Sequence, residues 1–289
     1  MAERRLPGVT ASPASCPGHA AGVRLGSPLG TEPQMRRLVA DSRWSYRNHP
    51  FAHIHVEDVF VPCVYEQLAA AFRGVLATGA DRAGSARLAY YGAKFDGYIL
   101  PFRSGLRGPL AIFTSRAWVE LLARATGVEA TADVNGALHH HAKGSQNGFV
   151  HKDYSACWFI DRPRADGVNL SDNALCNYRT GKTTVAGAVA RERVRAVAMI
   201  YYLNNAPWVE GDGGETGLYL STNDDVAQPA ATIPPVNNSM LVFECSPYSC
   251  HSFISSRRNA RNSVAMWLHR TKETAVARWG GKSILYLRN

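Results

Sequence analysis

The sequence predicts an α+β fold in which helices come first and a jelly-roll body of short strands follows. Residues 51–127 contain two segments with the apolar spacing of amphipathic helices, and the chain after Asn135 contains one short strand-like run after another. These runs are rich in β-branched and aromatic residues and are separated by Gly, Pro, Asn and Asp. Many short strands with turn residues between them are typical of a sandwich, a barrel or a jelly roll.

The N-terminal half of the chain supplies the helices. Residues 51–60 (FAHIHVEDVF) predict a short strand, and Pro62 then opens a helix. The apolar residues of this helix recur at helical spacing, at Val64, Leu68, Ala71, Phe72 and Val75. A second helix is predicted over roughly residues 115–126, and Gly127 is a natural C-cap for it.

The strand-rich half is interrupted once. In chain order, its predicted strands are ALHHHA, FVHKDYSACWFI, VRAVAMIYYLN, TGLYLS, SMLVFECS, CHSFIS and NSVAMWLHR. Between the second and the third, residues 161–192 form a polar stretch that is too long for a plain turn. We interpret this stretch as a functional insertion that acts as a lid over the mouth of the jelly roll; the alternative is a solvated loop.

Length and composition indicate one large globular domain. The 289 residues are 46% hydrophobic, which excludes a disordered or fibrous chain. Residues 1–31 are rich in Pro, Gly, Ala and Ser and show no hydrophobic period. We therefore expect a flexible N-terminal arm, followed by a single domain over residues 32–289.

Charge and cysteine usage restrict the partners and the compartment. The formal charge of +9 invites a nucleic-acid interpretation, but the basic residues are dispersed along the chain, so we expect no nucleic-acid partner. Six cysteines without CxxC spacing indicate reduced thiols rather than a disulfide framework. Because the sequence has no apolar run long enough to span a bilayer and no secretory signal, we expect a cytoplasmic protein without a membrane partner. The oligomeric state stays open.

Three residues form a candidate metal site. His151 and Asp153 share one face of a predicted strand, because side chains i and i+2 of a strand point the same way. The motif alone is weak, and the similar pair His55 and Glu57 is interpreted as an ordinary strand pair. His251, in a later predicted strand, can add a second imidazole. Two histidines and one carboxylate on one face of an octahedron suit non-haem Fe(II) and O₂ chemistry.

A candidate anion site follows ten residues after His251. Arg261, Ser263, Ala265 and Trp267 alternate onto one face of the last predicted strand. A guanidinium beside an iron site suits a dicarboxylate co-substrate, because its planar fork binds a carboxylate through two hydrogen bonds.

Taken in order, these segments resemble the Fe(II)/2-oxoglutarate-dependent oxygenases, and within them the prolyl-hydroxylase-like branch. The resemblance runs from about His53 to Arg270. It comprises FAHIHVEDVFVPCVYEQLAAAF, the three metal candidates, IYYLN, Trp208, GDGGETGLYL and RNSVAMW. It implies a double-stranded β-helix (jelly-roll, cupin-like) core with N-terminal helices packed on one sheet. It also implies an enzyme that uses Fe(II), 2-oxoglutarate and O₂.

The resemblance implies roles for single residues as well. The three metal candidates match the iron ligands of the family, and the intact Asp153 argues against halogenation, because halogenases of the family replace this carboxylate with a small residue. Arg261 matches the residue that pairs with the C5 carboxylate of 2-oxoglutarate, with Ser263 assisting. Tyr202, the second tyrosine of IYYLN, matches a tyrosine whose hydroxyl reaches the same carboxylate.

Three further positions are less defined. His141 stands where relatives often carry a tyrosine near the C1 carboxylate of 2-oxoglutarate. This departure leaves open whether His141 binds the co-substrate, touches the substrate or only packs. Trp267 and Trp208 are candidate aromatic residues of the substrate pocket.

The expected reaction is oxidation of an unactivated C–H bond, most simply hydroxylation, with release of succinate and CO₂; desaturation and cyclisation stay open. Residues 161–195 hold seven basic and four acidic residues, so we expect an anionic small-molecule or amino-acid-derived substrate, as in specialised metabolism. The alternatives are a peptidyl (prolyl-type) hydroxylase that acts on a protein and a non-catalytic jelly-roll binding module.

Overall fold

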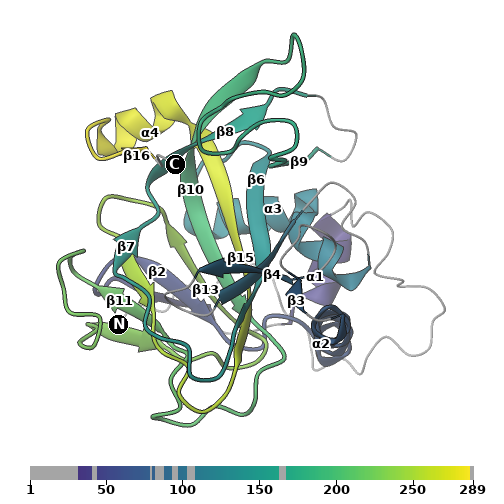
Figure 1. Cartoon of the computed structure of the whole chain (residues 1–289), viewed down its shortest axis with the longest axis vertical. Coiled ribbons are helices and arrows are strands. Elements are labelled where there is room, and N and C mark those ends of the chain that lie inside the picture. Colours follow the sequence, from purple (N-terminus) through teal and green to yellow (C-terminus); the bar gives the residue numbers. More distant parts are fainter. Residues whose placement is uncertain are drawn as a thin grey trace.

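Two sheets form the body of the protein (Figure 1). The computed structural model describes residues 32–40, 44–78, 80–81, 88–92, 97–102, 108–162 and 167–286. The arm predicted over residues 1–31 lies outside this part of the chain. Within it, one sheet is large and the other has four strands.

Eight strands alternate between the two sheets. In chain order they are β6 (Asp133–His141), β7 (His151–Lys152), β10 (Ala190–Tyr202), β11 (Thr216–Tyr219), β12 (Ala231–Ile233), β13 (Ser239–Glu244), β14 (Cys250–Phe253) and β15 (Arg261–Thr271). The large sheet places β13, β10, β15 and β6 side by side, and the small sheet has the order β12-β11-β14-β7. The chain therefore crosses between the sheets after β6, β7, β10, β12, β13 and β14, which is the winding of a double-stranded β-helix.

The two sheets face each other across a small apolar cluster. Tyr202, Leu241 and Phe243 of the large sheet share this cluster with Leu218 and Ile233 of the small sheet. The inner face of the large sheet is thus covered by the small sheet, and the site described below lies between them.

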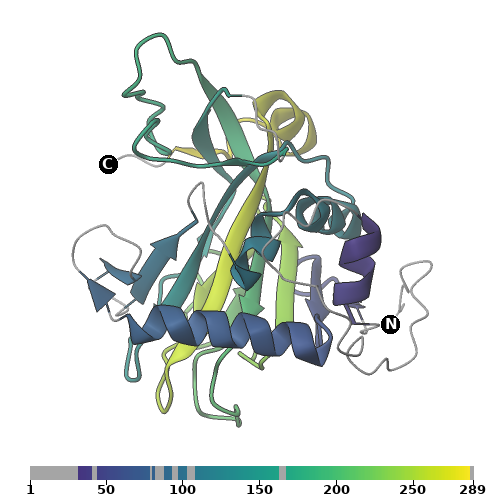
Figure 2. The same cartoon turned by 90° about the vertical axis from the view of Figure 1, so that its right-hand side faces the viewer.

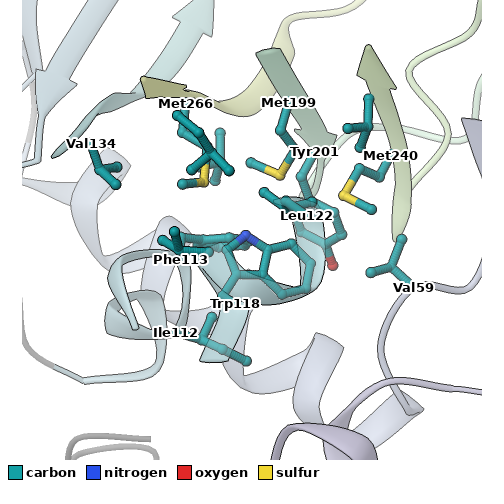
Figure 3. Packing of buried hydrophobic residues seen from close by; sticks show 14 of the residues in the cluster. Val59, Ile112, Phe113, Trp118, Leu122, Val134, Met199, Tyr201, Met240 and Met266 are labelled. Carbon is teal, nitrogen blue, oxygen red and sulfur yellow. The ribbon is translucent and has the colours of Figure 1, made fainter. Parts of the chain in front are cut away.

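Helices cover the outer face of the large sheet. The helices are α1 (Glu32–Leu38), α2 (Pro62–Ala77), the 3₁₀ helix η1 (Pro109–Thr114), α3 (Arg116–Thr126) and α4 (Lys272–Trp279). Phe113 and Trp118 pack against Met199, Tyr201 and Met240 in the main core (Figure 3). The long helix α2 lies on the same side (Figure 2) and contributes buried residues to the same core.

Both predicted N-terminal helices are found. Pro62 is the first residue of α2. The side chain of Ser115 caps α3 by accepting a hydrogen bond from the backbone N–H of Trp118, and Gly127 ends that helix with φ of 66°. A left-handed residue at this position favours glycine, because glycine has no Cβ to clash.

The remaining strands extend or edge the large sheet. They are β1 (Trp44–Arg47), β2 (His53–Val56), β3 (Ala80–Asp81), β4 (Leu88–Gly92), β5 (Gly97–Pro101), β8 (Ser155–Ile160), β9 (Asn169–Leu170) and β16 (Leu285–Tyr286). The run FVHKDYSACWFI, predicted as one strand, is two, because the chain leaves the small sheet after β7 and joins the large sheet at β8. Neither β12 nor α4 was indicated by the sequence.

The excursion between β8 and β10 corresponds to the predicted insertion at 161–192, although Ala190 already begins β10. Its described residues, 167–189, are held by β-pairing. β9 pairs in parallel with β6, and Cys176 forms an isolated bridge with Thr183. No helix among the described residues has the length and apolar character needed to cross a membrane.

Candidate metal centre

Two histidines of the small sheet lie side by side. His151 of β7 and His251 of β14 are directly paired in register, and their ring centroids are 4.4 Å apart. Asp153 follows β7 at the point where the chain crosses to the large sheet. One ligand atom from each of the three residues lies within 4.8 Å of the others. The structure thus brings together the three predicted metal ligands.

The histidines present the same ring nitrogen to this centre. Nδ1 of His151 lies 2.9 Å from the carbonyl oxygen of Phe149, and Nδ1 of His251 lies 3.2 Å from that of Ser249. These contacts favour the tautomer in which Nδ1 carries the proton, so Nε2 keeps its lone pair for a metal. The donor set of two Nε2 atoms and one carboxylate fits Fe(II).

The surroundings hold both side chains in the form that binds a metal. Burial and the neighbouring His251 lower the pKa of His151 to about 4, so its imidazole is neutral near pH 7. Burial opposes ionisation of Asp153, but the positive charge of the Arg195 guanidinium outweighs it and holds the pKa of this carboxyl well below its usual range.

Asp153 is fixed by two side chains of the large sheet. Nη1 of Arg195 donates to Oδ1 of Asp153 at 2.5 Å, and Nε1 of Trp267 donates to Oδ2 at 2.6 Å. The guanidinium also lies over the Trp267 ring, 4.0 Å from its centroid. Trp267 therefore lies at the metal centre, on the inward face predicted for it.

Arg195 is a site residue that the sequence did not reveal. In the sequence, Arg195 counts among the basic residues of the stretch 161–195, but in the structure it belongs to β10. Tyr202 faces inward and Tyr201 faces the helices, so strict alternation would turn Arg195 outward. The pairing of β10 with β15 shifts between Arg195 and Val197, and this β-bulge returns Arg195 to the inner face.

A polar pocket lies beside the metal centre on the large sheet. Cross-strand pairing places Arg261 opposite His141, and Ser263 between His139 and Tyr202. Thr216 on the small sheet joins them: its Oγ1 accepts from Nη2 of Arg261 at 3.2 Å and lies 2.6 Å from the Tyr202 hydroxyl.

Two buried polar atoms of this pocket lack a protein partner. Nε of Arg261 and Oγ of Ser263 make no hydrogen bond to any described residue. Buried polar atoms normally have hydrogen-bond partners, so an unsatisfied guanidinium nitrogen beside an unsatisfied hydroxyl indicates a binding site for an acceptor group such as a carboxylate. The pocket thus fits the C5 carboxylate of 2-oxoglutarate.

A family model agrees with this geometry. The model described as the 2OG-Fe(II) oxygenase superfamily matches residues 174–269, a stretch that contains His251 and Arg261. The remaining two metal candidates lie just upstream and converge on His251. This part of the chain is therefore similar to the 2OG-Fe(II) oxygenase superfamily. Members of that superfamily use Fe(II), 2-oxoglutarate and O₂.

The chain is also similar to single proteins that are named as prolyl hydroxylases. A prolyl 3,4-dihydroxylase of Ostreococcus tauri is 36% identical over 91 residues, which cover 29% of this chain and 18% of the relative. A Pseudomonas putida prolyl-4-hydroxylase is similar in structure, with 19% identity and a TM-score of 0.47 over 78% of this chain and 92% of that one. A Trichoplax adhaerens prolyl hydroxylase, solved with a hypoxia-inducible-factor peptide, has 16% identity and a TM-score of 0.48 over 78% and 86%.

His141, whose role the sequence left open, lies beside Arg261 in the polar pocket. Its ring stacks on Phe253, with centroids 3.9 Å apart, and the cross-strand partner of His141 is Arg261. His139 shares this face, whereas His140 points the other way and contacts Asn262. Burial and the charge of Arg261 lower the pKa of His139 to about 3, so this imidazole is neutral near pH 7.

The other sequence candidates lie outside the metal centre. Trp208 lies in the connection between β10 and β11, its Nε1 donates to the Gly213 carbonyl, and it lines a small pocket that Arg261 also lines. His55 lies on β2, but Glu57 lies just beyond that strand, so the two residues are not the strand pair that the sequence indicated. Neither belongs to the group of metal candidates among the described residues.

Proposed function

We propose that this oxygenase hydroxylates a prolyl residue of a peptide or protein, with Fe(II), 2-oxoglutarate and O₂. The observation that carries the chemistry is the convergence of His151, Asp153 and His251 beside the Arg261 pocket. The prolyl substrate is supported by the 36% identity to the prolyl 3,4-dihydroxylase. We further propose a single oxygenase domain over residues 32–289.

Each residue of the site has a defined task in this proposal. The two histidines and Asp153 hold Fe(II), which, with 2-oxoglutarate, supplies the oxidising power for C–H hydroxylation. Arg261 and Ser263 bind the C5 carboxylate, and the Tyr202–Thr216 hydrogen bond fixes the wall of that pocket. Arg195 and Trp267 orient the Asp153 carboxylate through one contact to each oxygen.

The entrance of the site suits a peptide. Phe149, two residues before His151, is 64% exposed, and its ring centroid lies 5.1 Å from that of His151. An exposed aromatic ring at this point offers apolar contact area to a prolyl ring and its neighbours. We propose the described residues 167–189 of the excursion as the candidate lid of this entrance.

The expectation of a small anionic substrate loses part of its support. It depended on the basic residues at 161–195. Arg193 is paired with Asp133 at 2.6 Å, and Arg195 with Asp153 at 2.5 Å; Arg191 is paired with Asp161. Three of the seven basic residues are thus neutralised within the protein and are not available to an anionic substrate.

The test supplies the full chain with Fe(II), 2-oxoglutarate and air, and offers proline-containing peptides, the same peptides with alanine in place of proline, and free L-proline. We expect succinate formation that depends on the proline-containing peptides, and a peptide product heavier by one oxygen atom. Turnover of free L-proline alone would contradict a peptidyl substrate.

Two variants separate the metal centre from its surroundings. Asp153→Ala should bind no Fe(II) and form no succinate. Asp161→Ala, which removes an exposed carboxylate paired with Arg191, is the matched control and should retain both. Equal loss in the two variants would contradict the assigned metal centre.

A further inference from the structure

The excursion between β8 and β10 sends one side chain back towards the metal centre. Tyr178 is 7% exposed and packs against Phe159 and His269. Its carbonyl oxygen accepts a hydrogen bond from the backbone N–H of Trp158 at 2.8 Å, which anchors this part of the excursion to β8. The tyrosine therefore belongs to the folded body, although it lies in the longest connection between core strands (Figure 1).

The Tyr178 hydroxyl sits between two buried nitrogen atoms. It lies 2.9 Å from Nε2 of His269 and 3.3 Å from Nε of Arg195. Nδ1 of His269 lies 3.0 Å from the Asp133 carbonyl oxygen, which fixes the proton on Nδ1. The hydroxyl therefore donates to Nε2 of His269 and accepts from Nε of Arg195.

Arg195 links the Tyr178 hydroxyl to the Asp153 carboxylate. A guanidinium is a rigid plane, so contacts at two of its nitrogens fix its orientation. Nε is held by Tyr178 and Nη1 donates to Asp153, while the ring of Trp267 supports one face of the plane. Without the Tyr178 hydroxyl, the Arg195 guanidinium would lose one of the two hydrogen bonds that fix its plane.

We propose that Tyr178 is a positioning residue that couples the excursion at 167–189 to the metal centre through Arg195 and Asp153. The inference rests on the metal site of the proposed function, but not on the identity of the substrate. The coupling is reciprocal: if the packed excursion favours metal binding, then the metal must favour the packed excursion to the same extent.

The first measurement is the affinity for Mn(II), a stand-in for Fe(II) that is stable in air, in the full chain. Residues that orient metal ligands typically contribute about 10- to 100-fold to affinity, and Tyr178 acts one step further out, so we expect Tyr178→Phe to weaken binding by about 10-fold. Circular dichroism and the unfolding midpoint establish that the variant is folded.

Tyr201→Phe is the matched control. Tyr201 is also a buried tyrosine, its hydroxyl donates to Oδ1 of Asn238 at 2.9 Å, and it faces the helices on the outer side of β10. Its removal costs a comparable hydrogen bond at a distant site, so Mn(II) affinity should change by less than about twofold.

The second measurement tests the reverse direction. Arg179 and Lys182 are exposed residues of the excursion, and the bonds that follow them are trypsin sites. We expect Mn(II) to slow cleavage at these bonds in the wild-type chain by severalfold, relative to cleavage after the exposed Arg47 of β1. The Mn(II) effect should vanish in Tyr178→Phe and persist in Tyr201→Phe.

The outcomes separate this inference from the proposed function. Normal Mn(II) binding by the wild-type chain, with equal affinity in Tyr178→Phe and Tyr201→Phe, would overturn the coupling and leave the metal centre intact. Metal protection that persists in Tyr178→Phe would overturn it as well. Failure of the wild-type chain to bind Mn(II) would overturn the metal centre and the coupling together.

Discussion

At the scale of single residues, Arg195 and Arg261 show two uses of the same buried guanidinium. Arg195 has a carboxylate of the protein itself, Asp153, as its partner. Arg261 has only the Thr216 hydroxyl as its hydrogen-bond partner among the described side chains, and its Nε is unsatisfied. Arg195 therefore orients a candidate metal ligand, whereas Arg261 keeps the unsatisfied nitrogen that its proposed role in binding 2-oxoglutarate requires.

Replacement of Arg261 tests this distinction. Arg261→Lys keeps the charge but loses the planar fork, so affinity for 2-oxoglutarate should fall by about 10- to 100-fold, since hydrogen bonds to charged groups are worth about 1.5–3 kcal/mol. Calorimetric titration in the presence of Mn(II) measures this change, and Mn(II) affinity itself should stay the same.

Arg270→Lys provides the comparison for this variant. Arg270 is also a buried arginine of β15, but it donates to Glu244 at 2.8 Å. The Arg270→Lys variant should leave the affinity for 2-oxoglutarate unchanged. An equal loss of affinity in both variants would contradict the assignment of Arg261 as the anchor.

At the scale of elements, one turn sets the position of the Arg261 strand. Gly213 has φ of 81° and lies against the connection between β14 and β15, where a Cβ on Gly213 would stand 1.9 Å from the Ser255 carbonyl oxygen. Gly211 in the same turn has φ of 90°, but a Cβ there would meet open space. An alanine at position 211 would therefore cause backbone strain alone, whereas an alanine at position 213 would add a steric clash.

We expect Gly213→Ala to destabilise the protein well beyond Gly211→Ala. Gly211→Ala has only the left-handed conformation to oppose it, at about 1 kcal/mol. Gly213→Ala must also displace the backbone at Ser255 and with it the start of β15, so we expect a loss of at least about 3 kcal/mol. Denaturant unfolding measures both, and equal losses would show that the Ser255 contact is not rigid.

Strand alternation carried most of the site prediction. It places Arg261, Ser263 and Trp267 on one face of β15, and it separates Tyr202 from Tyr201 on β10. The periodicity of a strand is local, so the sequence alone reveals it.

What the sequence could not show depends on breaks in that periodicity or on contacts between distant segments. The bulge beside Arg195 leaves no sequence signature, and Trp208 lies in a connection that has no period at all. Tyr178 reaches the site only because the excursion folds back on β8. β12 has only three residues, too few to distinguish a strand from a turn.

At the scale of the whole molecule, buried neutral histidines link stability to pH. Burial lowers the pKa of His269 to about 3, that of His139 to about 3 and that of His151 to about 4. Burial lowers the pKa values of His53 and His55 as well. In the unfolded chain each of these groups returns to a pKa near 6.5, so below this pH the unfolded state binds more protons.

The metal-free protein should therefore lose stability as the pH falls from 6.5 towards 4. One pKa unit corresponds to about 1.4 kcal/mol, and several histidines act together, so we expect a loss of several kcal/mol. Urea unfolding at constant ionic strength and a series of pH values measures it. A constant free energy of unfolding over this range would show that these histidines are protonated in the folded state.

Metal binding should stabilise the whole molecule as well. A ligand that binds only the folded state at 100 times its dissociation constant adds about 2.7 kcal/mol. We expect Mn(II) to raise the free energy of unfolding of the wild-type chain by this amount and to leave that of Asp153→Ala unchanged. A similar rise in both would indicate that Mn(II) binds outside the centre formed by His151, Asp153 and His251.

The pairing of His151 with His251 across β7 and β14 also decides where the chain can change its length. Deleting one residue within β14 would turn Cys250 or Ser252 towards the metal in place of His251, because neighbouring side chains of a strand face opposite ways. The connection at residues 254–260 carries no such constraint, provided that Gly213 can still pack against it. Insertions and deletions should therefore accumulate in the connections and be excluded from the short strands of the small sheet. The connections can then vary in length while the metal ligands keep their positions.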